Sequence, residues 1–334
     1  MSLENKESLE PHHEKEEANL QSDSSVESYG HFATYEQTIN DDVMILTFNN
    51  FIRHNVHLFR GKVVLDLECG VGVLSMIAAK AGAGRVIGVE KSNIVEHARR
   101  LVQSNNLYDK VEILQGKIEE ISLPDGVEKV DIIISQWTVG DCVFYESVME
   151  SVLFARDKYL APGGLVFPDR VTFFISGLED RRHKEENLDW WNSVHGFNMS
   201  SIRAVALTEP EVALVNKKRL VTNNCLLREI NLMTLKKEDI PFETMFQLHV
   251  KRTDFIHALV VYYEVEFTHI GSSKRFGFST APEAPYTKWR QTKFYLDDYL
   301  SCAEGELVHG FFKLKSVKPR ELDFDIDVVF QVMK

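Results

Sequence analysis

The segment between residues 63 and 90 constrains the fold more than any other part of the chain. It begins with the short apolar run Val63-Val64-Leu65-Asp66-Leu67, continues through a glycine-containing turn and a helical segment, and ends with a second apolar run at Glu90. Apolar runs of this length that alternate with helical segments are typical of parallel strands covered by helices. The sequence therefore predicts an α/β domain built on a doubly wound parallel sheet.

The same alternation extends on both sides of this segment. Apolar residues recur at three- and four-residue spacing from about Tyr35 to Leu58, which predicts a helical stretch before the first strand. The other elements expected in this domain are strands at 63–67, 86–90, 111–114 and 130–135, and helices at 74–80 and about 93–103.

The pattern changes after Pro162-Gly163-Gly164. Alternating segments follow at 171–175, 226–232, 258–267 and 324–330. Such segments predict an antiparallel β-barrel or sandwich. Between the first two lies a polar excursion, from 180 to about 209, which contains Trp190-Trp191 and Phe197.

Charge is distributed unevenly along the chain. The net charge is −12, and residues 1–27 account for −6 of it through eight acidic residues and two lysines. Because this segment has no aromatic and few aliphatic residues, we expect a disordered acidic tail. The acidic balance also argues against direct binding to nucleic acid.

The cysteines and histidines favour a reduced compartment without metal. Cys69, Cys142, Cys225 and Cys302 lie far apart, with no C-x-x-C motif, as is usual in cytosolic proteins. The sequence shows neither a signal peptide nor an apolar run long enough to cross a bilayer. We expect a cytoplasmic location, with nuclear entry left open, no membrane contact and no metal site, since no histidine spacing is typical of one.

The turn after the first strand indicates a ligand-binding crevice. Asp66-Leu67-Glu68-Cys69-Gly70-Val71-Gly72 lies at the carboxyl edge of the predicted sheet, where glycines let the backbone approach a ligand. Glu90 ends the second strand, a position from which an acid commonly accepts hydrogen bonds from ribose hydroxyls. A tight turn without a ligand is the alternative. A nicotinamide site fits less well, because the G-x-G-x-x-G spacing is absent.

Longer motifs resemble the type I protein arginine methyltransferase family. They extend from about Ser28 to Phe330 at nearly constant spacing, and they include Val64-Leu65-Asp66 with Gly70-x-Gly72, Gly116-Lys117-Ile118-Glu119-Glu120, Phe144-Tyr145-Glu146-Ser147, Phe167-Pro168-Asp169-Arg170 and Pro285-Tyr286-Thr287. The resemblance implies a Rossmann-like methyltransferase domain with its N-terminal helices at 28–168. It further implies a β-barrel domain at 169–334, with a helical dimerisation arm inserted at about 180–209.

The resemblance also assigns roles to individual residues. For S-adenosylmethionine it implies contacts with the methionine end from Asp66, Gly70 and Gly72, with the ribose from Glu90, and with the adenine from Ile118 and Glu119. In the arm, the implied subunit interface consists of Trp190, Trp191, Phe197 and Met199. Exposed apolar patches usually need cover. The alternative is that these side chains are covered by their own domain instead of by a second subunit.

The substrate loop departs from the family pattern. The family holds the substrate guanidinium between two glutamates, since paired carboxylates match a planar cation. Here Gln136 replaces the first glutamate, Glu146 matches the second, and one extra residue lies between them. Lys288, beside Trp289, stands where the family has a histidine. We expect these four residues to be the vestiges of a catalytic site.

Two further departures concern the cofactor. Glu68 stands where the family has a glycine, and Met44 aligns with an arginine that pairs with the methionine carboxylate. Both changes disfavour a bound carboxylate by Coulomb's law. We therefore expect binding of S-adenosylmethionine to be weak or lost.

An intact fold with altered chemistry favours a supporting role. Within the family, the chain most resembles the catalytically inactive paralogue, or prozyme, that activates a catalytic partner. We expect a heterodimer or heterotetramer with an active arginine methyltransferase, which would methylate Arg/Gly-rich RNA-binding proteins. The alternative is an active type I enzyme with a divergent substrate loop.

Overall fold

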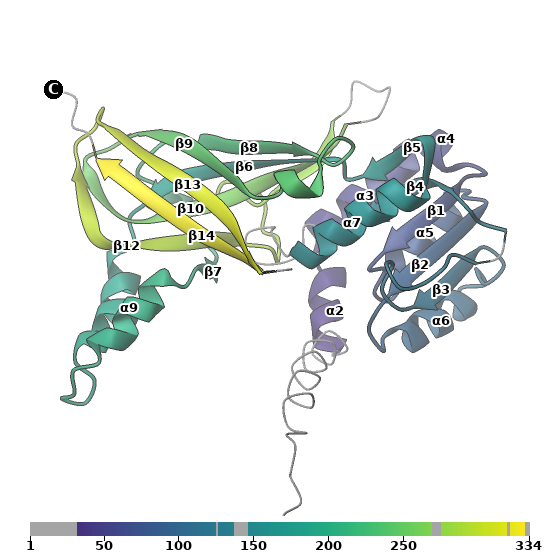
Figure 1. The fold of residues 1–334 in the computed structure, drawn as a ribbon, viewed down its shortest axis with the longest axis horizontal. Coiled ribbons are helices and arrows are strands. Elements are labelled where there is room, and N and C mark those ends of the chain that lie inside the picture. Colours follow the sequence, from purple (N-terminus) through teal and green to yellow (C-terminus); the bar gives the residue numbers. More distant parts are fainter. Residues whose placement is uncertain (1–31, 125, 137–145, 269–274, 319–320, 331–334) are drawn as a thin grey trace, which may run out of the picture.

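The computed structural model describes residues 32–124, 126–136, 146–268, 275–318 and 321–330. The predicted tail at 1–27 and most of the substrate loop, at 137–145, lie outside these ranges. Figure 1 shows a helix-covered sheet beside a β-barrel, from which a helical projection extends.

The first domain is a five-stranded parallel sheet with strand order β3-β2-β1-β4-β5. Its strands are β1 (Val63–Leu67), β2 (Arg85–Glu90), β3 (Val111–Gln115), β4 (Val130–Ser135) and β5 (Leu160–Phe167). The helices that pack on it include α5 (Val73–Lys80), α6 (Val95–Ser104) and α7 (Glu146–Tyr159). The predicted doubly wound sheet is confirmed. The chain reverses its direction of strand addition between β1 and β4, where such sheets open a crevice for ligands.

The N-terminal helical stretch is divided into three helices rather than one. They are α2 (Phe32–Ile39), α3 (Asp42–His54) and α4 (Val56–Phe59). Asp41 causes the first break, because its carboxylate accepts a 3.1 Å hydrogen bond from the backbone N–H of Met44 and so caps α3. A buried Asn55 separates α3 from α4.

The second domain is an antiparallel barrel made of two sheets, which confirms the predicted β-rich half. One sheet has the order β7-β12-β10-β6-β8 with β11 on β10, and the other has the order β14-β13-β9. The strands are β6 (Arg170–Leu178), β7 (Glu211–Ala213), β8 (Cys225–Asn231), β9 (Phe242–His249), β10 (Asp254–Phe267), β11 (Phe276–Ser279), β12 (Gln291–Cys302), β13 (Leu307–Lys318) and β14 (Glu321–Phe330). Single 3₁₀ turns lie at η3 (Lys217–Arg219) and η4 (Lys237–Asp239).

One apolar core continues from the first domain into the barrel. At the junction, the ring of Phe51 on α3 lies 4.5 Å from that of Phe167 at the end of β5 and 4.5 Å from that of Phe267 at the end of β10. Each of these three side chains is almost completely buried. Helix α3 therefore joins the two domains through aromatic packing, which holds the crevice of the first domain against the barrel.

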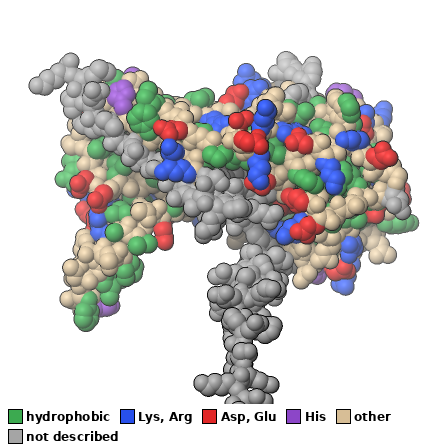
Figure 2. Space-filling model, viewed as in Figure 1, with side chains coloured by type: hydrophobic (Ala, Val, Ile, Leu, Met, Phe, Trp, Pro, Cys, Tyr) green, Lys and Arg blue, Asp and Glu red, His purple; other side chains and the backbone are tan. Residues whose placement is uncertain are grey.

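The helical projection follows β6 and returns to the barrel at β7 (Figure 1). It consists of α8 (Arg181–His183), a π-helical turn η1 (Lys184–Leu188), a 3₁₀ turn η2 (Asp189–Asn192) and α9 (Ser200–Thr208). We refer to residues 180–209 as the arm. Hydrophobic side chains are visible on its surface in Figure 2.

Candidate cofactor and substrate site

The turn between β1 and α5 has the backbone shape that its glycines predict, with one exception. Gly70 and Gly72 adopt positive φ angles of 54° and 80°, which glycine favours. Glu68 also adopts a positive φ, of 53°. A side chain there is unfavourable by roughly 1 kcal/mol or more. Glu68 thus occupies a position whose backbone suits the glycine that the resemblance implied.

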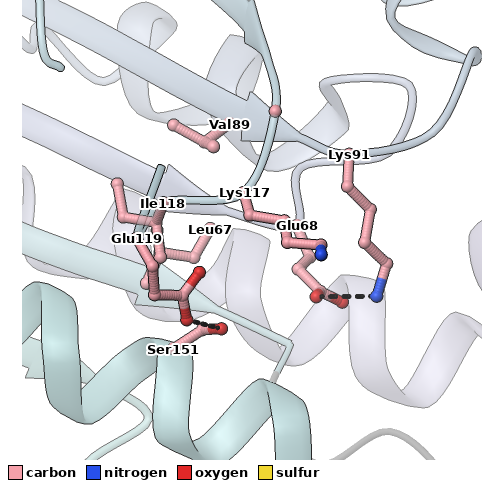
Figure 3. Close-up of a pocket in the computed structure, with 9 residues that line it drawn as sticks. Leu67, Glu68, Val89, Lys91, Lys117, Ile118, Glu119 and Ser151 are labelled. Atoms are coloured by element: carbon pink, nitrogen blue, oxygen red, sulfur yellow. Dashed lines mark hydrogen bonds and ion pairs between the residues drawn. The ribbon is translucent and has the colours of Figure 1, made fainter. Parts of the chain in front are cut away.

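Two adjoining pockets lie along the carboxyl ends of the strands. The Ile118 pocket encloses about 470 Å³ and is lined by residues that include Leu67, Val89, Ile118, Glu119 and Ser151 (Figure 3). The Trp289 pocket encloses about 750 Å³ and is lined by residues that include Thr38, Ile45, Gly70, Glu90, Gln136, Lys288 and Trp289. Seven of the predicted cofactor and substrate residues therefore come together from both domains: Gly70, Glu90, Ile118, Glu119, Gln136, Lys288 and Trp289.

An ion pair separates the two pockets. The carboxylate of Glu68 lies 3.4 Å from the ammonium of Lys91 (Figure 3). Both residues line both pockets. Burial raises the pKa of Glu68, and the charge of Lys91 lowers it in part. A ligand that spanned both pockets would have to pass this pair.

Glu90 is held in a fixed orientation at the end of β2. Its Oε2 accepts a 3.0 Å hydrogen bond from the N–H of Gly70, and its Oε1 accepts a 2.9 Å bond from the N–H of Ser92. Each carboxylate oxygen has a further lone pair. The side chain can therefore accept hydrogen bonds from ribose hydroxyls without losing the two bonds that hold it.

Asp66 and Gly72 lie beside the crevice but are not among the residues that line either pocket. Asp66 is buried, and its Oδ2 accepts a 2.6 Å hydrogen bond from the hydroxyl of Ser75 on α5. Burial raises the pKa of Asp66 to about 7. Gly72 forms the N-cap of α5. Both residues shape the turn rather than expose a group to the pockets.

The residues expected at the adenine lie in the Ile118 pocket. Ile118 is buried against the core, and the Oε1 of Glu119 accepts a 2.6 Å hydrogen bond from the hydroxyl of Ser151 on α7 (Figure 3). This arrangement places an apolar surface beside a carboxylate. Such a combination suits a flat heterocycle that carries an amino group.

The substrate half of the crevice contains a lysine. The ammonium of Lys288 donates a hydrogen bond to the hydroxyl of Thr38 and lies 4.1 Å from the centroid of the Trp289 ring. Burial lowers the pKa of Lys288 to about 8, although Asp41 raises it in part. Since that value is above 7, the ammonium stays largely protonated at neutral pH.

The other substrate-site predictions are described only in part. Gln136 lines the Trp289 pocket, and the buried indole N–H of Trp289 has no hydrogen-bond partner among the described residues. Glu146 begins α7, but its side chain lies outside the described residues. Met44 is fully buried in the core rather than in the pocket, and its neighbour Ile45 lines the pocket instead.

Sequence reasoning missed Lys91 and Ser151. Lys91 directly follows Glu90, so its closeness to the turn could have been inferred from β2 alone. Ser151 lies 32 residues from Glu119, and only the tertiary fold brings the two together.

Comparisons with known proteins agree with this geometry. Residues 58–193 match the model of a methyltransferase domain, and residues 169–333 match the model of the arginine methyltransferase oligomerization subdomain. Protein arginine N-methyltransferase 8-B of Danio rerio is 47% identical over 307 residues, which cover 91% of this chain and 72% of that protein. The chain belongs to the protein arginine methyltransferase family.

Other members of the arginine methyltransferase family agree over similar lengths. Protein arginine N-methyltransferase 1 of Caenorhabditis elegans is 47% identical over 305 residues, which cover 91% of this chain and 87% of that one. Among solved structures, the Trypanosoma brucei PRMT1 enzyme–prozyme heterotetrameric complex with AdoHcy matches with a TM-score of 0.86 at 36% identity, and the match covers 91% of this chain and 95% of that one.

Two further observations describe this family member. Within the described ranges, no helix is long and apolar enough to span a membrane. In the same part of the chain, no group of three or more His, Cys, Asp or Glu side chains is arranged to hold a metal ion.

Proposed function

We propose that this chain is the regulatory subunit of a hetero-oligomeric protein arginine methyltransferase and is catalytically deficient by itself. The observation that carries the proposal is the charge of the Trp289 pocket. The carboxylates of Glu68 and Glu90 are balanced by the ammonium groups of Lys91 and Lys288, so the described charged residues of this pocket carry no net charge. A guanidinium substrate needs an anionic site, whereas this pocket presents the partly buried ammonium of Lys288.

The replacement of one substrate carboxylate by Gln136 supports the same proposal. Removing one partner of a buried charge pair costs about 3–5 kcal/mol. If that loss is expressed in the transition state, the rate falls by more than about a hundredfold. Gln136 keeps the shape of a glutamate but supplies neither its charge nor its second acceptor oxygen.

The binding of S-adenosylmethionine is proposed to be weak or lost. Glu90, Ile118 and Glu119 suit the ribose and adenine, whereas Glu68 places a carboxylate in the turn expected at the methionine end. The Glu68–Lys91 ion pair also lies between the two pockets that the cofactor would have to join. Displacing this pair and repelling the methionine carboxylate would both lower the affinity.

The proposed partner is a catalytically active arginine methyltransferase. The matched Trypanosoma brucei structure is an enzyme–prozyme heterotetramer, and this chain contains the oligomerization subdomain. On this proposal the mixed complex is a heterodimer or heterotetramer that acts in the cytoplasm on Arg/Gly-rich RNA-binding proteins. The chain itself does not contact nucleic acid.

Labelled methyl transfer to an Arg/Gly-rich peptide tests the proposal. The assay compares this chain, a catalytic family member from the same organism, and the two co-expressed. We expect no transfer by this chain and at least about tenfold more transfer by the mixture than by the partner alone, a change of about 1.4 kcal/mol in the barrier. Strong transfer by this chain alone would instead establish the alternative, an active type I enzyme, which its 47% identity to proteins named as methyltransferases favours.

Replacing Glu68 with glycine is expected to restore part of the cofactor affinity. The substitution removes a carboxylate and relieves the strain of a side chain at a positive φ. We therefore expect S-adenosylmethionine to bind at least roughly tenfold more tightly. Equilibrium dialysis with labelled cofactor measures the effect. Glu68→Gln is the matched control, because it removes the charge and keeps the bulk. Equal affinities for wild type and Glu68→Gly would show that Glu68 does not limit binding.

A further inference from the structure

One buried lysine joins both ends of the arm to the barrel. The arm leaves the barrel at Asp180 and returns at Glu211, and Lys293 lies between them on β12 with 5% of its surface exposed. Its ammonium lies 3.0 Å from Oδ2 of Asp180 and 2.8 Å from Oε2 of Glu211. It also donates a 2.7 Å hydrogen bond to the hydroxyl of Tyr295.

The groups around this ammonium are themselves fully engaged. The hydroxyl of Tyr295 donates a 2.6 Å hydrogen bond to Oδ2 of Asp180, and Arg219 pairs with Oδ1 of the same carboxylate. Burial opposes ionisation of Asp180, but the hydrogen bonds from Tyr295 and Lys293 outweigh it and lower the pKa of Asp180. We call Lys293, Asp180, Glu211 and Tyr295 the root cluster.

A second set of contacts fixes the arm further from its root. Lys184 of the arm donates a 2.8 Å hydrogen bond to the carbonyl of Leu296 on β12. Arg203 on α9 pairs with Asp189 at 2.9 Å and with Asp297 of β12 at 2.8 Å. The arm is therefore held by polar contacts with one barrel strand along much of its length.

Apolar packing also places the arm, because Leu188 is buried in a cluster with barrel residues and Ala206 and Leu207 of α9 pack against that cluster. Helix α9 has no buried residue. Other apolar side chains of the arm face outward, with Trp190 47%, Phe197 67% and Val205 59% exposed. The direction of the arm is thus fixed by this apolar packing together with the root cluster and the Lys184 and Arg203 contacts.

We propose that Lys293 is a positioning residue for oligomerisation, which holds the arm in its binding orientation before a partner subunit arrives. The partner it serves is a protein surface that covers the exposed apolar side chains of the arm. A preordered arm loses little conformational freedom on association, so affinity is gained without an added contact. The role of Lys293 in a mixed complex rests on the proposed function, whereas the ordering of the arm by Lys293 is a property of the single chain.

Lys293→Met in the full chain tests the proposal. Methionine keeps the length of the side chain but leaves the buried carboxylate of Asp180 and the partly buried carboxylate of Glu211 without their shared cation. Hydrogen exchange of the chain alone is measured at residues 181–208, with the amides of β1 and β2 as the internal reference. We expect exchange in the arm to rise at least about tenfold, with the reference unchanged. Lys313→Met is the matched control, since Lys313 pairs with Glu243 at 2.7 Å on the exposed face of the barrel.

Association with the partner identified in the methyl-transfer experiment supplies the second measurement. We expect the Kd of the mixed complex to rise at least about tenfold for Lys293→Met and to stay unchanged for Lys313→Met. Unchanged exchange in the arm would show that Lys293 does not hold the arm in place. Faster exchange with an unchanged Kd would overturn its role in oligomerisation.

A second variant covers the case in which Lys293→Met does not fold. The triple substitution Lys293→Met, Asp180→Asn and Glu211→Gln leaves no buried charge unpaired, and the same two measurements and outcomes apply to it. The exchange measurement needs no partner. If the mixture shows no activation, the proposed function fails. Hydrogen exchange of the chain alone still decides whether Lys293 orders the arm.

Discussion

Activation of a catalytic partner is expected to be lost when Trp190 and Trp191 are both replaced with alanine. Trp190 is 47% exposed, and the two indole rings pack edge to face with centroids 4.9 Å apart. Paired aromatic side chains of this kind are typical interface hot spots, each contributing about 2 kcal/mol or more. Their joint removal should weaken the mixed complex by roughly a hundredfold or more.

The measurement is methyl transfer by the partner as a function of the concentration of the variant. Tyr108→Ala is a suitable control, because Tyr108 is 70% exposed but lies on the methyltransferase domain, outside the arm. That variant should activate as well as wild type does. Undiminished activation by the double tryptophan variant, with an unchanged thermal transition, would mean that the partner is bound through another surface.

The largest effect on stability is expected from Phe51→Ala. The ring of Phe51 packs against Phe167 of the methyltransferase domain and Phe267 of the barrel, both with centroids 4.5 Å away, and it is fully buried. Truncating a buried phenylalanine costs about 3–5 kcal/mol, because apolar surface is lost and a cavity remains. We expect a decrease of that size in the free energy of unfolding, together with less cooperative unfolding of the two domains.

Urea denaturation followed by fluorescence and circular dichroism measures this change. Leu46→Ala on the same helix is the matched control, since Leu46 is 50% exposed. Its effect should stay within about 0.5 kcal/mol. A decrease below about 1 kcal/mol for Phe51→Ala would show that the junction tolerates the cavity and that α3 does not hold the two domains together.

The parallel sheet could be predicted because its inner strands are continuous apolar runs. The strand β5 was missed, since Pro162-Gly163-Gly164 resembles a break, although the structure includes these residues at the start of an edge strand. The strand β12 was missed for a different reason. It contains the buried polar residues Gln291 and Lys293, which occupy positions where a pattern search expects apolar or solvent-facing side chains.

The site could be predicted where its residues lie at the ends of strands that are adjacent in the sheet. The glycine turn and Glu90 belong to adjacent strands, so their closeness follows from the sheet. The roles of Ile118 and Glu119 came only from the family resemblance, because nothing in their spacing indicates adenine. The contact of Lys288 with Thr38 joins residues 250 positions apart. No local pattern could have shown that this ammonium lies in the crevice.

The shared core has a consequence for how such a chain can evolve. The apolar side chains of the methyltransferase domain and of the barrel form one continuous cluster, so neither domain could be deleted without exposing the other's core to water. Natural selection that acts only on assembly would therefore still preserve the cofactor-binding fold. A subunit of this kind could lose its chemistry through a few substitutions in the crevice and yet retain the whole ancestral architecture.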